Sequence, residues 1–175
     1  MFIYQMTEYK EILKFWFPND NFNKFWFSAD KNIDEYIKTN FFEFMKKIIS
    51  TGDLSYVSED ELLAKIIVFD QFTRNIYRNT SLAYHYDYLA IKLANEYFKL
   101  NYDEKHTFNK IIFALMPFRH SEKIQDQKFV LNYLNNSNLN KDSSIYKKFL
   151  KASLISYNTI LQHGFFPKRL SFKLD

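Results

Sequence analysis

The fold is decided by the stretch Leu62-Leu-Ala-Lys-Ile-Ile-Val-Phe-Asp-Gln-Phe-Thr-Arg-Asn-Ile-Tyr-Arg78. Its first half, up to Phe69, is apolar on most sides, which is typical of a helix buried inside a domain. Ser58, with Glu61 three residues later, forms a capping box and predicts that the helix begins there. The sequence therefore places a buried helix at the centre of the molecule.

Apolar residues recur at helical spacing on both sides of this stretch. Two glycines and three prolines in 175 residues disfavour a sheet with many tight turns. We expect seven helices, at about 7–17, 33–51, 58–78, 81–100, 104–116, 121–135 and 143–164, with Pro18 and Pro117 as stops and Gly52 and Gly164 as C-caps. Short connections favour antiparallel neighbours, and the polar segment 134–143 is the expected long loop. Residues 1–175 are predicted to form one all-α domain of stacked antiparallel hairpins.

Composition excludes several classes of function. The absence of cysteine excludes disulfides, thiolate catalysis and Cys-based metal sites. No apolar run is long enough to cross a membrane, and the first residues lack a signal-peptide pattern, so we expect a cytoplasmic protein. The segment 141–175 is basic, but no nucleic-acid-binding motif accompanies it, and nucleic acid is the weakest partner hypothesis.

The chain contains four arginines and twenty lysines, and the arginines fall in three segments that also carry prolines, histidines and amides. Arg74 and Arg78 lie in 69–79, Arg119 in 115–122, and Arg169 in 163–169. A planar guanidinium grips a carboxylate or phosphate with two hydrogen bonds, which a lysine does not do. This distribution indicates a site.

In the first segment, Gln71, Arg74, Asn75 and Arg78 follow one another at i, i+3, i+4 and i+7, so an unbroken helix presents them as one stripe. Two interpretations remain open. The stripe is either a buried polar network, in which Arg74 pairs with Asp70 one turn earlier, or part of a ligand site.

The second segment ends one predicted helix at Pro117 and starts another, for which Ser121 is a better N-cap than a nucleophile. His120, Glu122 and Asp126 could hold a hard divalent metal, or accept hydrogen bonds from the arginines of the first segment. No recognised metal-ligand spacing supports the first alternative, and we predict neither metal nor cofactor.

The third segment follows the last long helix. His163 lies in the final turn of that helix, where a cation is favoured. Pro167 stiffens the approach to Arg169, so that this arginine either serves a binding site or docks the C-terminal tail.

At these three segments the chain resembles the bacterial family catalogued as domain of unknown function 924. The motifs that carry the resemblance are Asp70-Gln-Phe-Thr-Arg-Asn-Ile-Tyr-Arg78, Pro117-Phe-Arg-His-Ser-Glu122 with Asp126-Gln127, Gly164-Phe-Phe-Pro-Lys-Arg-Leu170, and the aromatic Phe15-Trp-Phe17 and Trp26-Phe27. The resemblance implies a tetratricopeptide-like helical fold and no established reaction. Thr73 stands where the family motif has proline, which implies a helix break there in relatives, and Leu170 stands where it has asparagine. Arg119 falls at a variable position of the motif and is left out of the candidate set.

Two functions follow as hypotheses, and enzyme activity is left open. The first is a site for a small anionic ligand, clamped by Arg74, Arg78 and Arg169, with His120 or Glu122 as candidate catalytic proton-transfer groups. Its full set of candidate ligand-binding residues is Asp70, Gln71, Arg74, Asn75, Arg78, His120, Glu122, Asp126 and Arg169. The second is a helical-repeat module that binds a peptide or protein partner and exposes the motif residues on a concave face.

Overall fold

The computed structural model describes residues 2–20 and 23–172, and the regular structure within them is helical. The α-helices are α1 (Phe2–Trp16), α2 (Lys31–Thr51), α3 (Glu59–Ile67), α4 (Thr73–Ile76), α5 (Asp87–Lys99), α6 (Phe108–His120), α7 (Ile124–Asn136), α8 (Ser144–His163) and α9 (Pro167–Leu170). The prediction of an all-α fold is confirmed. Among the described helices, none combines the length and apolarity needed to cross a bilayer.

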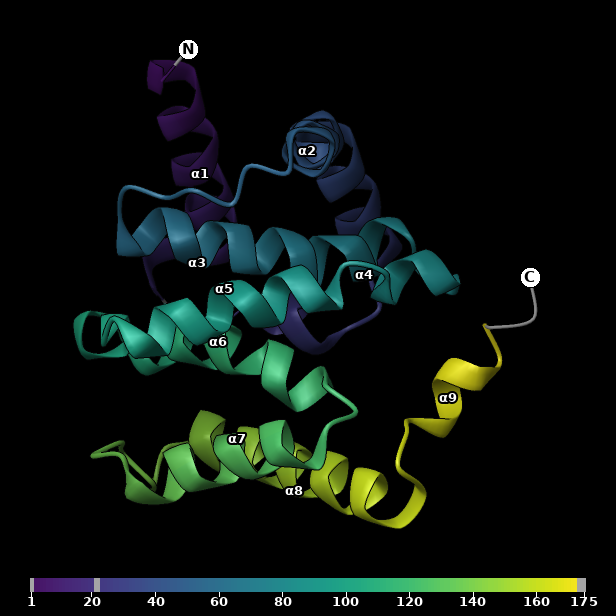
Figure 1. The fold of residues 1–175 in the computed structure, drawn as a ribbon. Helices are drawn as coiled ribbons and strands as arrows, with labels where there is room; N and C mark the ends of the chain where they lie inside the picture. The colour runs from purple at the N-terminus through teal and green to yellow at the C-terminus, as the bar shows by residue number, and fades with distance from the viewer. Residues whose placement is uncertain (1, 21–22, 173–175) are drawn as a thin grey trace.

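The helices stack in layers (Figure 1). Helix α5 runs antiparallel to both α3 and α6, and the α7–α8 hairpin packs beyond α6. Helices α1 and α2 cover the opposite side of α3 and α4, while the short α9 stands at the end of the stack near the start of α5. The predicted hairpin arrangement therefore holds for α3 to α8, whereas a tetratricopeptide-like superhelix stays a prediction.

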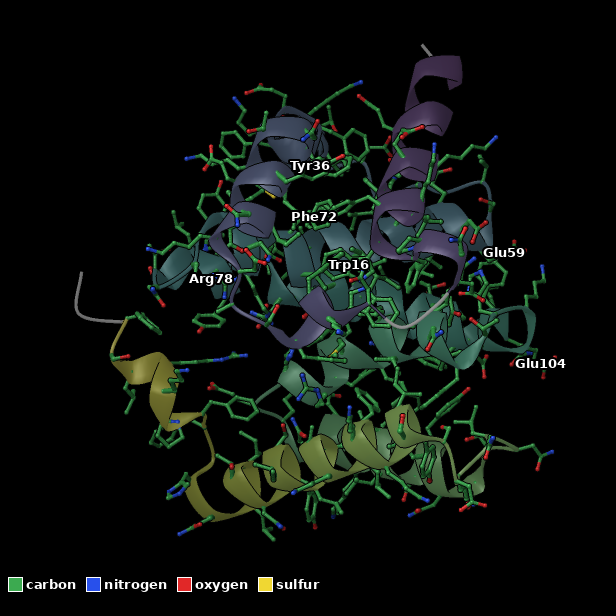
Figure 2. The ribbon with its side chains drawn as sticks, turned by 180° about the vertical axis from the view of Figure 1, so that it is seen from behind. Trp16, Tyr36, Glu59, Phe72, Arg78 and Glu104 are labelled. Atoms are coloured by element: carbon green, nitrogen blue, oxygen red, sulfur yellow. The ribbon has the colours of Figure 1, made fainter. Side chains whose placement is uncertain are left out.

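Aromatic rings fill the core where α1, α2, α3 and α6 meet. Trp16 lies with its ring centroid 5.5 Å from Phe72 and 5.4 Å from Phe113, and Phe41 stacks on Phe72 at 5.1 Å. Figure 2 shows Trp16 and Phe72 in the middle of the molecule. Such ring pairs contribute about 0.5–1.5 kcal/mol each beyond the area that they bury. The aromatic-rich sequence thus joins the first two helices to the central helix.

The predicted N-cap at Ser58 forms, and Ser143 caps the helix that we expected to begin near it. Ser58 Oγ accepts a hydrogen bond from the Glu61 amide at 3.1 Å, and the Glu61 side chain accepts one from the Val57 amide at 3.1 Å. Ser143 Oγ accepts from the Tyr146 amide at 3.3 Å. These bonds satisfy amides that have no partner inside the helix, which fixes where α3 and α8 begin.

Both predicted glycine C-caps are also confirmed. Gly52 ends α2 with φ 62°, and Gly164 ends α8 with φ 75°. A side chain at either position would be strained in this left-handed conformation, so the helices end where the glycines stand.

Pro117 does not stop its helix, contrary to our prediction. Helix α6 continues through it to His120. A proline removes the hydrogen bond to the carbonyl four residues earlier, which costs roughly 3 kcal/mol inside a helix. Because residues 111–118 are all buried, packing on every side of this segment outweighs that loss.

The predicted helices at 81–100 and 104–116 both begin later than expected. Residues Ser81–Tyr84 form a 3₁₀ turn before α5, and the carbonyl of Ala83 accepts a hydrogen bond from Arg74 at 3.1 Å. Asn101 adopts φ 54°, and a second 3₁₀ turn precedes α6. Both segments therefore form a 3₁₀ turn first, and the α-helices begin only at Asp87 and Phe108.

Candidate functional site

A π-helical turn, Val68–Phe72, interrupts the central helix between α3 and α4. The amide of Thr73 donates to the carbonyl of Val68, five residues back, instead of to Phe69. The Thr73 hydroxyl donates to the Phe69 carbonyl at 2.8 Å in place of that amide. The unbroken helix predicted for 58–78 is therefore wrong in detail, because the inserted residue changes which side chains share a face. Turns of this kind occur frequently at functional sites.

Asp70 lies within the π turn, and its side chain is 1 % exposed. It accepts hydrogen bonds from His120 Nδ1 at 2.8 Å, from Arg74 at 3.1 Å, and from the Gln71 amide. Burial alone would raise the pKa of Asp70, but His120 and Arg74 together hold it below its ordinary value. Asp70 is thus an ionised carboxylate at the centre of a buried network.

Arg74 connects this network to α5. Its guanidinium donates to Asp87 at 2.8 Å as well as to Asp70, and its plane lies 5.2 Å from the Tyr84 ring. Burial raises the pKa of Asp87 to about 6, although the Arg74 charge opposes the rise. The Nε atom of Arg74 is buried and has no acceptor among the described residues.

Arg78 forms a second, separate ion pair. Asp34, on α2, accepts two hydrogen bonds from it, at 2.5 and 2.6 Å, and a third from Asn75 at 2.8 Å. Burial favours the neutral acid, but these bonds lower the pKa of Asp34 below its ordinary value. The bidentate pair fixes α2 against α4.

Arg119 is the exception among the arginines. Its guanidinium donates to the sulfur of Met116, at 3.1 and 3.3 Å, and to Nε2 of His120 at 2.9 Å. No ion pair joins it to an Asp or Glu in the part of the chain that the structure describes. Burial lowers the pKa of Arg119 to about 10, so the group still carries its charge at neutral pH.

These side chains surround a cavity of about 380 Å³. One wall is polar and is formed by Gln71, Arg74, Asn75, Arg78, Arg119 and His120. The other lining residues are four aromatic residues, two small ones and a methionine: Trp16, Phe25, Trp26, Phe27, Ser28, Ala29 and Met116. Trp16 is 1 % exposed, and its Nε1–H is buried without an acceptor among the described residues.

Four of the nine predicted ligand-binding residues do not line the cavity. Asp70 belongs to the network described above, and the other three lie elsewhere. Glu122 accepts a hydrogen bond from the Phe166 amide at 2.9 Å, and Asp126 accepts one from Ser121 at 2.6 Å. Arg169 donates to the His120 carbonyl at 2.7 Å and lies 3.3 Å from Asp87. None of the three is among the residues that line the cavity. Arg169 instead attaches α9 to α5 and α6.

The Asp126-Gln127 pair closes the end of α6. Gln127 donates to the carbonyls of Phe118, Arg119 and Ser121, at 3.3, 2.8 and 2.6 Å. We predicted Ser121 as the N-cap of the next helix, and this prediction is wrong. That position is held by Lys123, whose amide donates to the Ser121 hydroxyl at 3.1 Å. Ser121 thus lies two residues before the N-cap, within the turn between α6 and α7.

The alternative of a metal on His120, Glu122 and Asp126 has no geometric support. His120 faces Asp70, whereas the other two side chains face Phe166 and Ser121. Among the residues that the structure describes, no three His, Asp or Glu side chains lie close enough to hold an ion together.

Sequence reasoning missed four residues of this region, namely Arg119, Trp16 and the carboxylates Asp34 and Asp87. Arg119 was left out of the candidate set because the family motif varies at its position. The signal that could have identified it is an arginine directly beside a histidine in the second segment. Asp34 and Asp87 belong to α2 and α5, and no local sequence pattern indicates where these helices lie relative to the arginines.

The chain matches a protein-family model and is similar to a solved structure. The family model described as "Bacterial protein of unknown function (DUF924)" matches residues 12–172. The solved structure of a protein of unknown function from Agrobacterium tumefaciens is similar to this chain, with a TM-score of 0.84 at 23 % identity over 97 % of this chain and 92 % of the other. At that identity the likeness supports the fold alone. No curated protein matches the chain.

Proposed function

The chain belongs to the bacterial protein family of unknown function DUF924, whose description assigns no ligand, and from the geometry of the cavity we propose that it binds a small organic anion. The observation that carries the proposal is the guanidinium of Arg119. It is charged, partly buried, and has a thioether and an imidazole as its partners in place of a carboxylate. The Asp70 charge offsets the desolvation of this guanidinium only in part, and an anion in the cavity would offset it further.

Two further donors support an acceptor-rich ligand. Trp16 Nε1 and Arg74 Nε are buried without an acceptor among the described residues, and both residues line the cavity. A buried donor without a partner costs about 1–3 kcal/mol. Ligand oxygens within reach of these groups would recover that free energy.

The aromatic wall indicates that the ligand has an apolar body. Trp16, Phe25, Trp26 and Phe27 line one side of the cavity. The volume of about 380 Å³ is near the lower end of the range of roughly 300–1,000 Å³ in which small-molecule sites fall. A ring-sized molecule with one acidic group suits both walls.

Calorimetric titration with phenylacetate, phenyl phosphate and inorganic phosphate tests this proposal, with benzylamine as a cationic control. We expect at least one aromatic anion to bind and benzylamine not to bind. The Arg119→Met variant should lose the binding. Lys99→Met removes one positive charge from an exposed side chain on α5 and should retain it. Equal binding by the two variants would overturn the proposal.

A second candidate function, docking of a peptide, is favoured by a larger hollow of about 750 Å³ between α1 and α2. Its lining combines the rings of Phe15, Tyr36, Phe41 and Phe44 with three carboxylates and one lysine (Glu8, Glu11, Glu43 and Lys14), together with Asn40. A basic amphipathic segment would complement it, as expected of a cytoplasmic, tetratricopeptide-like interaction module.

Fluorescence anisotropy with a labelled Lys/Leu-rich helical peptide tests this second function. Binding that Tyr36→Ala weakens would support it, and equal affinity of both proteins would refute it. The residues of segment 69–79 do not form such an exposed binding face themselves, because Gln71 is only 8 % exposed.

A further inference from the structure

Asp70 fixes the protonation state of the His120 ring. An ionised carboxylate only accepts hydrogen bonds, so the contact of 2.8 Å to Nδ1 requires that Nδ1 carries the proton. Arg74 and Gln71 hold the carboxylate in place from the other sides. Burial lowers the pKa of His120 despite the nearby Asp70 charge, so the ring is neutral and its Nε2 bears a lone pair.

The Nε2 atom belongs to the cavity side of the ring, since His120 is one of the lining residues and Asp70 is not. In the structure, Arg119 donates to Nε2 at 2.9 Å. The other acceptor of Arg119 is a thioether sulfur, which accepts hydrogen bonds weakly. An anionic oxygen is a stronger acceptor for a guanidinium than either group. An anion would therefore compete successfully for Arg119 and leave Nε2 free.

The charges around the cavity favour a ligand with a single negative charge. Arg78 is paired with Asp34, and Arg74 with Asp70 and Asp87. One guanidinium, that of Arg119, remains without a carboxylate among the described residues. A carboxylate matches its charge and its two-pronged geometry, whereas a phosphate dianion would introduce a second charge.

We infer that the ligand is a 2-hydroxy carboxylate with an apolar side chain, whose carboxylate binds Arg119 and whose hydroxyl donates to His120 Nε2. This inference rests on the proposed function. Because the Arg119 guanidinium and His120 Nε2 are direct neighbours, the ligand must carry its anionic acceptor and its hydroxyl donor on adjacent carbon atoms. A 2-hydroxy carboxylate has this arrangement. A 2-amino acid is disfavoured, because its ammonium group would lie beside two guanidinium groups.

His120 is then a hydrogen-bond acceptor for the ligand hydroxyl, and the proton stays on the hydroxyl oxygen. Asp70 acts as a positioning group, because its hydrogen bond to Nδ1 keeps that nitrogen protonated and leaves Nε2 as the acceptor. Asp70 already has Arg74 and Gln71 as partners, so it does not require His120 for its own neutralisation.

Three acids that differ at one atom test this inference, namely phenylacetate, mandelate and phenylglycine. We expect mandelate to bind about fivefold more tightly than phenylacetate, the difference that one hydrogen bond makes, and phenylglycine to bind most weakly. In His120→Phe the preference for mandelate over phenylacetate should disappear while both still bind. If that variant fails to fold, the same two acids are compared in His120→Gln. This side chain keeps a hydrogen-bond acceptor, so we expect the preference for mandelate to be reduced.

The ¹⁵N resonances of the His120 ring give a second readout in the unmodified protein. Before addition, Nδ1 should carry the proton and Nε2 should not. Phenylacetate should shift the Nε2 resonance downfield as Arg119 leaves it, and mandelate should shift it back as its hydroxyl takes that place. Equal affinity for mandelate and phenylacetate, or an unmoved Nε2 resonance, overturns the inference but leaves the proposed anion site intact. The same holds if phenyl phosphate alone binds. If no anion binds, the proposed function fails as well.

Discussion

Replacing Arg119 by methionine should stabilise the protein while abolishing its response to ligand. Replacing a buried ion pair by apolar side chains of similar volume is often stabilising by about 1–4 kcal/mol, and replacing a desolvated charge that has no carboxylate partner should act in the same direction. The low end applies here, because the side chain is only partly buried. The variant also loses a hydrogen bond to His120, two weak hydrogen bonds to the Met116 sulfur and a cation–ring contact of 5.8 Å with Phe149, which together are worth roughly 1–2 kcal/mol.

The net change that we expect in the free energy of unfolding lies between zero and a gain of about 2 kcal/mol. The response to ligand should differ far more. At a phenylacetate concentration of 100 times the dissociation constant, the wild type should gain about 2.7 kcal/mol, and Arg119→Met should gain nothing. Urea unfolding followed by circular dichroism, with and without phenylacetate, measures both quantities. A variant that loses more than about 2 kcal/mol and still responds to the ligand would show that Arg119 is a structural residue.

Three further changes test the supporting contacts. Thr73→Val removes the hydroxyl that satisfies the buried Phe69 carbonyl and should cost about 1–3 kcal/mol in urea unfolding, so an unchanged midpoint would contradict this role. Asp34→Asn should destabilise the protein at pH 7 by weakening the pair with Arg78. Because that pair lowers the pKa of Asp34, its contribution is lost as the pH falls through the folded-state pKa, and a deficit that persists unchanged at low pH would argue against it. Burial lowers the pKa of His120, so the unfolded chain takes up a proton first, and the wild type should lose about 2 kcal/mol between pH 7 and 5 that His120→Asn does not lose. Equal pH slopes would refute a neutral ring.

Much of the fold follows from local patterns in the sequence. The caps at Ser58, Gly52 and Gly164 form as predicted, because each depends on a few neighbouring atoms. Pro117 misled us because the penalty of a proline is local, whereas the packing that overrides it comes from α3, α5 and α7. The sequence shows the local cost of Pro117 in a helix, but it does not show the tertiary packing that offsets this cost.

The candidate site was predictable only in part. Gln71, Arg74, Asn75, Arg78 and His120 do line one cavity, although they come from two segments far apart in the chain. The division between arginines that pair with carboxylates and the one that does not depends on tertiary partners. No spacing rule relates α2 or α5 to the central helix. For that reason we included Arg169, which does not line the cavity, and left out Arg119, which does.

The most direct test of the anion site is a crystal structure of the protein soaked with (4-bromophenyl)acetate, in which the anomalous signal of bromine locates the ring. We predict the bromine against the Trp16 and Trp26 side of the cavity and the carboxylate oxygens within hydrogen-bond distance of the Arg119 guanidinium. A carboxylate bound instead at Arg169, or a bromine peak in the hollow between α1 and α2, would contradict the proposed site.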